Sequence, residues 1–194
     1  MNFLAHLYLA DNDDDSIIGN FIADHVKGNS INLYSETIKR GIRFHRMIDE
    51  FTDRNDIVME TVVNLRPHYR KYAGVVLDMY YDHFLGIQWA RYSNEPLPDF
   101  TLRMYAVLTS HMSILPKRSQ YILPYMIEGN WLLNYQHFDG LHRALSGIAS
   151  RTKFNSGLES SVEHLRDNYE FYRSSFNDFF PQLIKYSKSE NYEY

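Results

Sequence analysis

The feature that most constrains the fold is an apolar, aromatic run over residues 75–85 that carries two aspartates, Asp78 and Asp82. In a helix, side chains four residues apart lie on one face, with about 5–6 Å between their Cβ atoms. Two carboxylates at that spacing repel, and a carboxylate buried among apolar side chains needs a hydrogen-bonding or metal partner. The run therefore predicts a largely buried helix whose two carboxylates share one cation.

The rest of the chain has the periodicity of helices. Apolar residues recur three or four positions apart in segments such as 17–26 and 35–51, and turn signals such as 94–98 separate the segments. No run alternates in the manner of a β-strand. With 44% apolar and 23% charged residues among 194, the chain can build one ordinary globular core. We predict an all-α, single-domain helical bundle over residues 1–186, followed by a polar, frayed tail over residues 187–194.

Caps, glycines and prolines set the expected limits of the helices. Ser35 is a candidate N-cap, the Arg66-Pro67 step predicts a break or a kink, and Pro181 predicts the end of the last helix. We expect helices at about 3–9, 17–26, 35–51, 55–65, 71–92, 100–114, 118–129 or beyond, 131–150 as one helix or as two that break at 139–140, and from 156 or 160 to 181.

Several kinds of function are excluded by what the chain lacks. It has no cysteine, so disulfides, thiolate zinc sites and a thiol nucleophile are impossible. A net charge of −4 argues against nucleic-acid binding. No run reaches the roughly eighteen apolar residues of a transmembrane helix, and the first ten residues lack the basic region of a secretory signal. We therefore expect a cytoplasmic protein without membrane or nucleic-acid partners.

Other short segments supply candidate metal ligands. His45 and Asp49 form a second pair one helical turn apart, Asp24 lies in an apolar surround, and His6 interrupts an apolar helix. Such a mixed set of imidazole and carboxylate groups suits Mn²⁺, Mg²⁺, Fe²⁺ or Zn²⁺. Each member also has a simpler interpretation, because a lone histidine is often a core residue and a helical His–Asp pair is often a surface contact. Together, these residues favour a metal site.

A basic face, consisting of Lys39, Arg40, Arg43 and Arg46, lies on the same predicted helix as His45. Such a run of basic residues usually lies on the solvent-exposed surface of a helix. Beside a metal site, however, guanidinium groups are suited to bind phosphate oxygens. The sequence contains no glycine-rich nucleotide-binding loop of the usual patterns and no Gly-x-Ser-x-Gly.

Five blocks of the sequence, in this order and spacing from residue 1 to about 180, resemble the acyl carrier protein phosphodiesterase family. They are Met1-Asn-Phe-Leu-Ala-His-Leu-Tyr-Leu-Ala10, Gly19-Asn-Phe-Ile-Ala-Asp24, Gly41-Ile-Arg-Phe-His-Arg-Met-Ile-Asp49, Leu77-Asp-Met-Tyr-Tyr-Asp-His-Phe84 and Ser146-Gly-Ile-Ala-Ser-Arg151. The resemblance implies an all-helical fold distantly related to the HD-type metal-dependent phosphohydrolases. It also implies removal of 4′-phosphopantetheine from holo acyl carrier protein with a divalent cation, most often Mn²⁺.

The chain departs from HD-type enzymes in having no His-Asp dipeptide, because the central block reads Asp82-His83. We therefore assign roles by spacing. The expected metal ligands are Asp24, His45, Asp78 and Asp82. Asp49 is expected to orient His45 or act as a base, and His6 and His83 to serve as hydrogen-bond donors, ligands or the acid for the leaving serine oxygen. Arg43 and Arg46 are expected to neutralise phosphate charge, with Arg151 a weaker candidate.

Acyl carrier proteins are acidic, so the basic face is expected to steer them. Two other functions remain open. One is an HD-like phosphohydrolase of a small phosphoester or nucleotide, which would not depend on a carrier protein. The other is a non-catalytic helical protein that holds a structural metal or binds carrier protein. The sequence makes no prediction of the oligomeric state.

Overall fold

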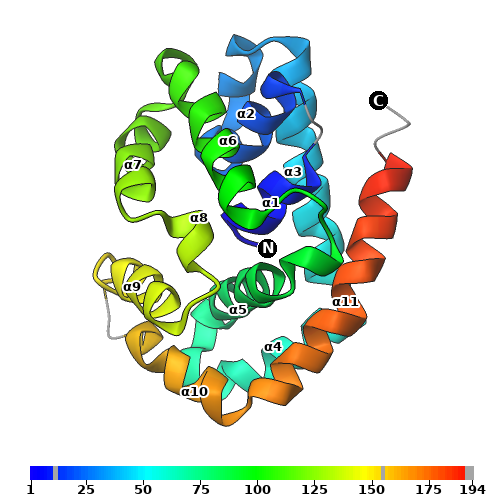
Figure 1. Ribbon diagram of the computed structural model, residues 1–194, viewed down its shortest axis with the longest axis vertical. Helices are drawn as coiled ribbons and strands as arrows, with labels where there is room; N and C mark the ends of the chain where they lie inside the picture. The colour runs from blue at the N-terminus through cyan, green and yellow to red at the C-terminus, as the bar shows by residue number, and fades with distance from the viewer. Residues whose placement is uncertain (11–12, 154–155, 191–194) are drawn as a thin grey trace.

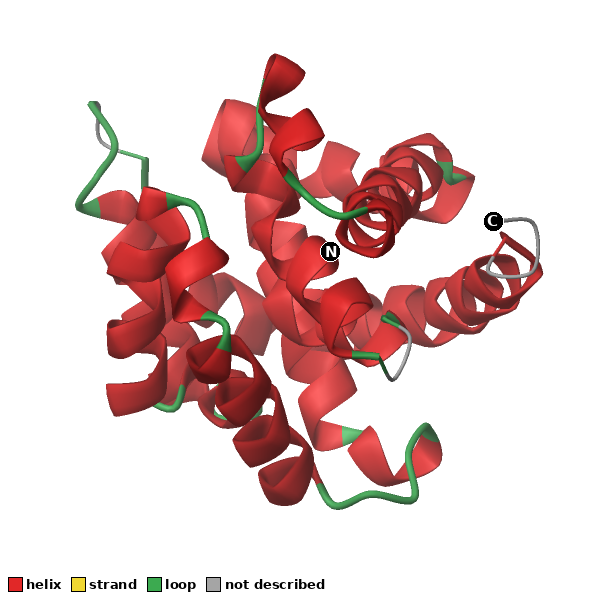
Figure 2. Cartoon of the chain, turned by 90° about the horizontal axis from the view of Figure 1, so that it is seen from above, coloured by secondary structure: helices red, strands yellow, loops and turns green. Residues whose placement is uncertain are grey.

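The computed structural model describes residues 1–10, 13–153 and 156–190, which form helices joined by short turns, with no strand among them (Figures 1 and 2). The α-helices are α1 (Phe3–Leu9), α2 (Asp14–Ile22), α3 (Glu36–Arg54), α4 (Asp56–Tyr69), α5 (Ala73–Ile87), α6 (Leu97–Ser110), α7 (Lys117–Glu128), α8 (Trp131–Asn134), α9 (Phe138–Ala149), α10 (Ser161–Asp167) and α11 (Tyr169–Glu190). The 3₁₀ helices are η1 (Ala23–His25), η2 (Gly28–Leu33), η3 (Arg70–Tyr72), η4 (Trp89–Arg91), η5 (Met112–Ile114) and η6 (Leu158–Ser160). The predicted all-α fold is confirmed.

Helix α5 forms the centre of the molecule. It packs against α1, α4, α9 and α11, which surround it in Figure 1. Most of its apolar and aromatic side chains are buried, and Tyr80, Tyr81 and Phe84 have no solvent exposure. Because burying large apolar side chains is the main stabilising contribution to folding, this helix organises the core. The prediction of a largely buried helix over this run is confirmed.

Helices α2 and α3 approach closely because two glycines face each other where they pack. A Cβ atom on Gly19 would lie 2.2 Å from the carbonyl oxygen of Ile38, and one on Gly41 would lie 2.5 Å from that of Ser16. No side chain larger than hydrogen fits at either position without moving the backbone. Ser35 caps α3 as predicted, by accepting a hydrogen bond from the backbone N–H of Ile38 at 3.2 Å. The close crossing brings the polar residues of α2 and α3 together.

Two predicted helix limits at prolines are wrong. Pro67 lies inside α4, and Pro181 lies inside α11, which continues to Glu190. A proline removes one backbone hydrogen bond, but buried apolar residues on both sides hold each helix in place. Phe180 and Leu183, for example, flank Pro181 and are fully buried. The tail predicted from residue 187 therefore begins as helix, and residues 191–194 lie outside the described part of the chain.

Other helix limits differ from the predicted ones by a few residues. The segment predicted as 17–26 ends at Ile22 and continues as η1, which carries Asp24. The segment predicted as 131–150 is two helices, but they separate before Phe138, not at 139–140. Among the described residues, we find no helix with the length and apolar character needed to cross a bilayer.

Candidate metal centre

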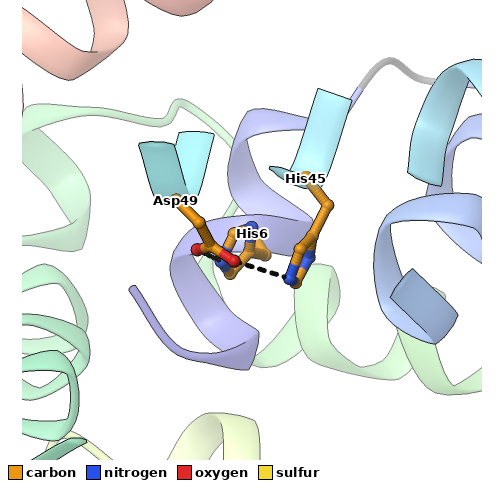
Figure 3. A group of neighbouring side chains, drawn as sticks. All are labelled: His6, His45 and Asp49. Carbon is orange, nitrogen blue, oxygen red and sulfur yellow. Dashed lines mark hydrogen bonds and ion pairs between the residues drawn. The ribbon is translucent and has the colours of Figure 1, made fainter. Parts of the chain in front are cut away.

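Three side chains that are distant in sequence meet beside the N-terminal end of the fold: His6 from α1, and His45 and Asp49 from α3 (Figure 3). His6 Nε2 lies 3.0 Å from Asp49 Oδ1, and His45 Nε2 lies 3.2 Å from Asp49 Oδ2. The two imidazole rings stack with their centroids 3.7 Å apart. One potential ligand atom from each residue falls within 4.8 Å of the others. This group can hold a metal ion.

Asn20 of α2 contacts both histidines, the backbone of His6 and the ring of His45. Its side-chain nitrogen donates to the carbonyl oxygen of His6 at 2.9 Å, so its Oδ1 faces His45 Nδ1 at 3.0 Å. An amide oxygen can only accept, so Nδ1 of His45 carries a proton in this contact, and when the ring is neutral the lone pair of Nε2 faces the site. In metal-binding histidines, a hydrogen bond from the ring nitrogen that does not bind the metal fixes the tautomer. Asn20 was assigned no role from the sequence; the available signal was its place on the same face of its helix as Asp24.

Two buried nitrogens of the site lack a hydrogen-bond partner within the described chain: His6 Nδ1 and His45 Nε2. Although His45 Nε2 lies close to Asp49 and Asp24, neither contact has hydrogen-bond geometry. Buried polar atoms in folded proteins are almost always paired, so these orphaned atoms indicate a missing partner. Imidazole and carboxylate donors suit a divalent transition ion. The residues present therefore fit a metal ion.

Asp24 adds a fourth candidate donor on η1. Its Oδ1 lies 3.4 Å from His45 Nε2, and its side chain is 72% exposed. The contact with His45 lowers the pKa of Asp24, which is therefore ionised at neutral pH. Because it is the exposed member of the group, Asp24 marks the side of the site that opens to solvent.

Burial and the neighbouring charges give the residues of the site different protonation states. Burial disfavours a charge on His45, but the carboxylates of Asp24 and Asp49 outweigh it and raise the pKa of His45 to about 8. Burial, together with the neighbouring His45, lowers the pKa of His6 to about 4. Burial alone would raise the pKa of Asp49, yet the two imidazoles hold it well below its usual range. His6 is therefore neutral, and Asp49 ionised, at neutral pH.

Asp82 caps α1. Its Oδ2 accepts from the backbone N–H of Leu4 at 2.8 Å and its Oδ1 from that of Ala5 at 3.2 Å, while Asn2, the N-cap residue, makes no side-chain cap. The carboxylate has no solvent exposure, and burial raises its pKa to about 7 against the effect of these two hydrogen bonds. Asp82 thus fixes the helix that carries His6.

Asp78, which shares a helix face with Asp82, has different contacts. One of its carboxylate oxygens lies 3.0 Å from the amino group of Met1, which lies 3.9 Å from Asp49. Asp78 therefore borders the group of His6, His45 and Asp49, which we call the triad. Neither aspartate of α5 is among the mutually close ligand atoms. A cation shared by Asp78 and Asp82, as the sequence predicts, would have to compete with the amino group of Met1 for Asp78 and with backbone N–H groups of α1 for Asp82.

His83 and the basic face lie away from these contacts. His83 Nδ1 donates to the carbonyl oxygen of Tyr135 at 2.9 Å, and its Nε2 lies 3.3 Å from the hydroxyl of Tyr169. Arg46 donates to the carbonyl oxygen of Val26 at 2.9 Å. Arg43 is exposed and lies about 160° around α3 from His45, at 3.6 residues per turn. The structure thus brings together His6, Asp24, His45 and Asp49, with Asp78 beside them.

Comparison with known proteins agrees with the resemblance. The family model described as "Acyl carrier protein phosphodiesterase" matches residues 1–183. A relative of that name from Enterobacter sp. (strain 638) is 36% identical over 191 residues, which cover 98% of this chain and 99% of the relative. Another of that name, from Photorhabdus laumondii, is 32% identical over 195 residues, which cover 100% and 98%.

No solved structure matches the chain. The family model nevertheless extends over nearly all of the sequence, and it includes each member of the triad and both aspartates of α5. The predicted resemblance is confirmed, and the chain belongs to the acyl carrier protein phosphodiesterase family.

Proposed function

We propose that this protein is a metal-dependent phosphodiesterase that removes 4′-phosphopantetheine from the serine of holo acyl carrier protein and leaves apo acyl carrier protein. The observation that carries the proposal is the triad, in which two buried nitrogens, His6 Nδ1 and His45 Nε2, lack hydrogen-bond partners in the described chain, in a member of this family. A phosphodiester is a poor electrophile because its oxygens are negatively charged, and a divalent ion offsets that charge.

His6, His45 and Asp49 would hold the ion, with Asp24 completing the set from the exposed side. We propose Mn²⁺ as the ion, because it is the one that the resemblance to the family implies. When bound, the ion supplies Lewis-acid activation of the phosphoryl group and of a water molecule. Asn20 holds the ring of His45 in place, and Asp82 fixes α1, so the donor set is organised before substrate arrives.

The reaction adds a water oxygen to phosphorus and breaks the bond between phosphorus and the serine oxygen. The serine oxygen takes one proton, and the other product is 4′-phosphopantetheine. Asp24 is the group that we propose to accept the proton of the attacking water, through the carboxylate oxygen that does not hold the ion, because it is ionised at neutral pH and open to solvent. Its pKa is lowered by His45, so it would release that proton readily to solvent or to the leaving oxygen.

The proposed partner is an acidic carrier protein, which meets the basic face of α3. Arg40 and Arg43 are exposed there, whereas Lys39 pairs with Glu36 at 2.8 Å. A local positive surface on a protein of net charge −4 can orient an acidic partner during encounter. Binding should therefore weaken as salt concentration rises.

Intact-mass spectrometry of holo acyl carrier protein tests the proposal. The carrier is incubated with the protein and Mn²⁺, and in parallel with EDTA. The variant Asp49→Asn removes a triad carboxylate, and Asp53→Asn is the matched control, one turn further along α3 and exposed. We expect the carrier to lose one phosphopantetheine with the wild-type protein and with Asp53→Asn only when Mn²⁺ is present, and Asp49→Asn to be inactive. An unchanged carrier mass, with folded protein and bound Mn²⁺, would overturn the proposal.

A further inference from the structure

A cavity of about 620 Å³ lies between the start of α1, the middle of α5 and the helices α7, α8 and α9. Cavities of this size accept a ligand as large as a typical drug molecule. Its wall is largely apolar and aromatic. The large apolar side chains that line it are Phe3, Met79, Tyr121, Ile122, Tyr125, Trp131, Tyr135 and Ile148. The sequence analysis drew no function from these aromatic residues.

Three arginines give the cavity its charge: Arg118, Arg143 and Arg151, all exposed at its edge. Within the described chain, none of the three guanidinium groups forms a salt bridge or a hydrogen bond, whereas Arg54 and Arg103 pair with glutamates. Among the described residues, no aspartate or glutamate lines the cavity. Unpaired guanidinium groups around an apolar pocket are suited to bind an anionic group, since one guanidinium group can donate two parallel hydrogen bonds to two phosphate oxygens.

The cavity adjoins the candidate metal centre. Three of its lining residues are sequence neighbours of the site or lie one helical turn from it: Asn2 lies one turn before His6, His25 follows Asp24, and Met79 follows Asp78. His25 Nδ1 lies 2.7 Å from the hydroxyl oxygen of Ser119, the residue after Arg118. His25 and Arg118 therefore line the part of the cavity that lies next to Asp24.

We propose that this cavity binds the 4′-phosphopantetheine arm of the substrate, with the phosphate toward His25 and Arg118 and the arm along the wall that contains Tyr121, Tyr125 and Trp131. This inference rests on the proposed function. The arm combines one phosphate with a flexible chain of methyl and amide groups, which matches a cavity lined by both arginine and aromatic side chains. Arg143 and Arg151 add positive potential at the mouth and attract the anion.

The test measures binding of free 4′-phosphopantetheine to metal-free protein by isothermal titration calorimetry in EDTA, with pantetheine as the ligand that lacks phosphate. Gly147 of α9 lines the cavity, and a Cβ atom added there would meet no atom within 4 Å. Gly147→Phe therefore fills the cavity from a tolerant helical position. Gly74→Phe is the matched control, because Gly74 is also helical and open but lines a different cavity.

We expect 4′-phosphopantetheine to bind the wild-type protein and Gly74→Phe equally, and Gly147→Phe at least about tenfold more weakly, since a filled cavity excludes the arm. Arg118→Gln should weaken binding about tenfold by removing a charged hydrogen bond, and should not affect binding of pantetheine. Circular dichroism verifies that each variant is folded. Should Gly147→Phe fail to fold, Arg118→Gln and the comparison of the two ligands decide the question.

If the wild-type protein does not bind 4′-phosphopantetheine, or if Gly147→Phe and Arg118→Gln both bind it as tightly as the wild-type protein does, this inference is overturned even if the carrier protein is hydrolysed. Binding that depends on the cavity, without any change in carrier mass, would uphold the cavity as a phosphopantetheine site and refute the proposed reaction. The two proposals can therefore fail separately.

Discussion

Substitutions of Asp82 distinguish two roles: the capping of α1, which the structure shows, and metal binding, which the sequence predicted. In the variant Asp82→Ala, the buried backbone N–H groups of Leu4 and Ala5 lose their acceptors at 2.8 and 3.2 Å. Each buried donor left without an acceptor costs about 1–3 kcal/mol. Removing the carboxylate also relieves the cost of burying it, which the raised pKa of Asp82 reflects.

The net loss should therefore be about 2–4 kcal/mol of unfolding free energy. A protein of 194 residues changes its Tm by about 2–4 °C per kcal/mol, so Asp82→Ala should unfold roughly 4–16 °C lower. Asp82→Asn retains one oxygen acceptor and should lose about half as much. The assay is thermal unfolding by circular dichroism, with and without Mn²⁺.

Metal dependence separates the two roles. A ligand bound to the native state at a hundred times its Kd stabilises that state by about 2.7 kcal/mol. If Asp82 only caps α1, Mn²⁺ should raise the Tm of Asp82→Asn as much as that of the wild-type protein, and should not raise that of Asp49→Asn. If Asp82→Ala has the same Tm as the wild-type protein, the capping role is refuted. If Mn²⁺ does not raise the Tm of Asp82→Asn, Asp82 is a metal ligand.

Four further outcomes are expected. Asn20→Ala should weaken Mn²⁺ binding about 10–100-fold in calorimetric titration, because His45 loses the contact that orients its ring. Gly19→Ala should lower unfolding stability by about 1–3 kcal/mol, since its Cβ would press on the carbonyl oxygen of Ile38, whereas Gly74→Ala should not. Arg43→Glu should slow association with holo acyl carrier protein in stopped-flow measurements at low salt and leave the dissociation rate nearly unchanged. Finally, the raised pKa of Asp82, about 7, means that the folded protein favours the neutral acid. The contribution of Asp82 to stability should therefore decrease as pH rises from about 4 to 7, and denaturant titrations should find no such decrease in Asp82→Asn.

Much of the site was visible in the sequence because it depends on local spacing. The pair of His45 and Asp49 follows from the helical repeat, and both were selected together with Asp24 and His6. The helices themselves were predicted for the same reason, because their apolar periodicity is a property of neighbouring residues. Helix ends at prolines were predicted less well, since the burial of side chains such as Leu183 outweighs one lost backbone hydrogen bond.

Tertiary structure decided which candidates meet. Spacing places Asp78 and Asp82 on one face of α5, but their partners come from elsewhere: the amino group of Met1 and the backbone of α1. Likewise, nothing in the sequence pairs His6 with His45, because the contact requires α1 to lie against α3. The sequence by itself determined the helices, the family and the kinds of ligand. Only the packing of the helices determined which ligands converge, because a helical repeat specifies the face of a side chain but not what lies opposite it.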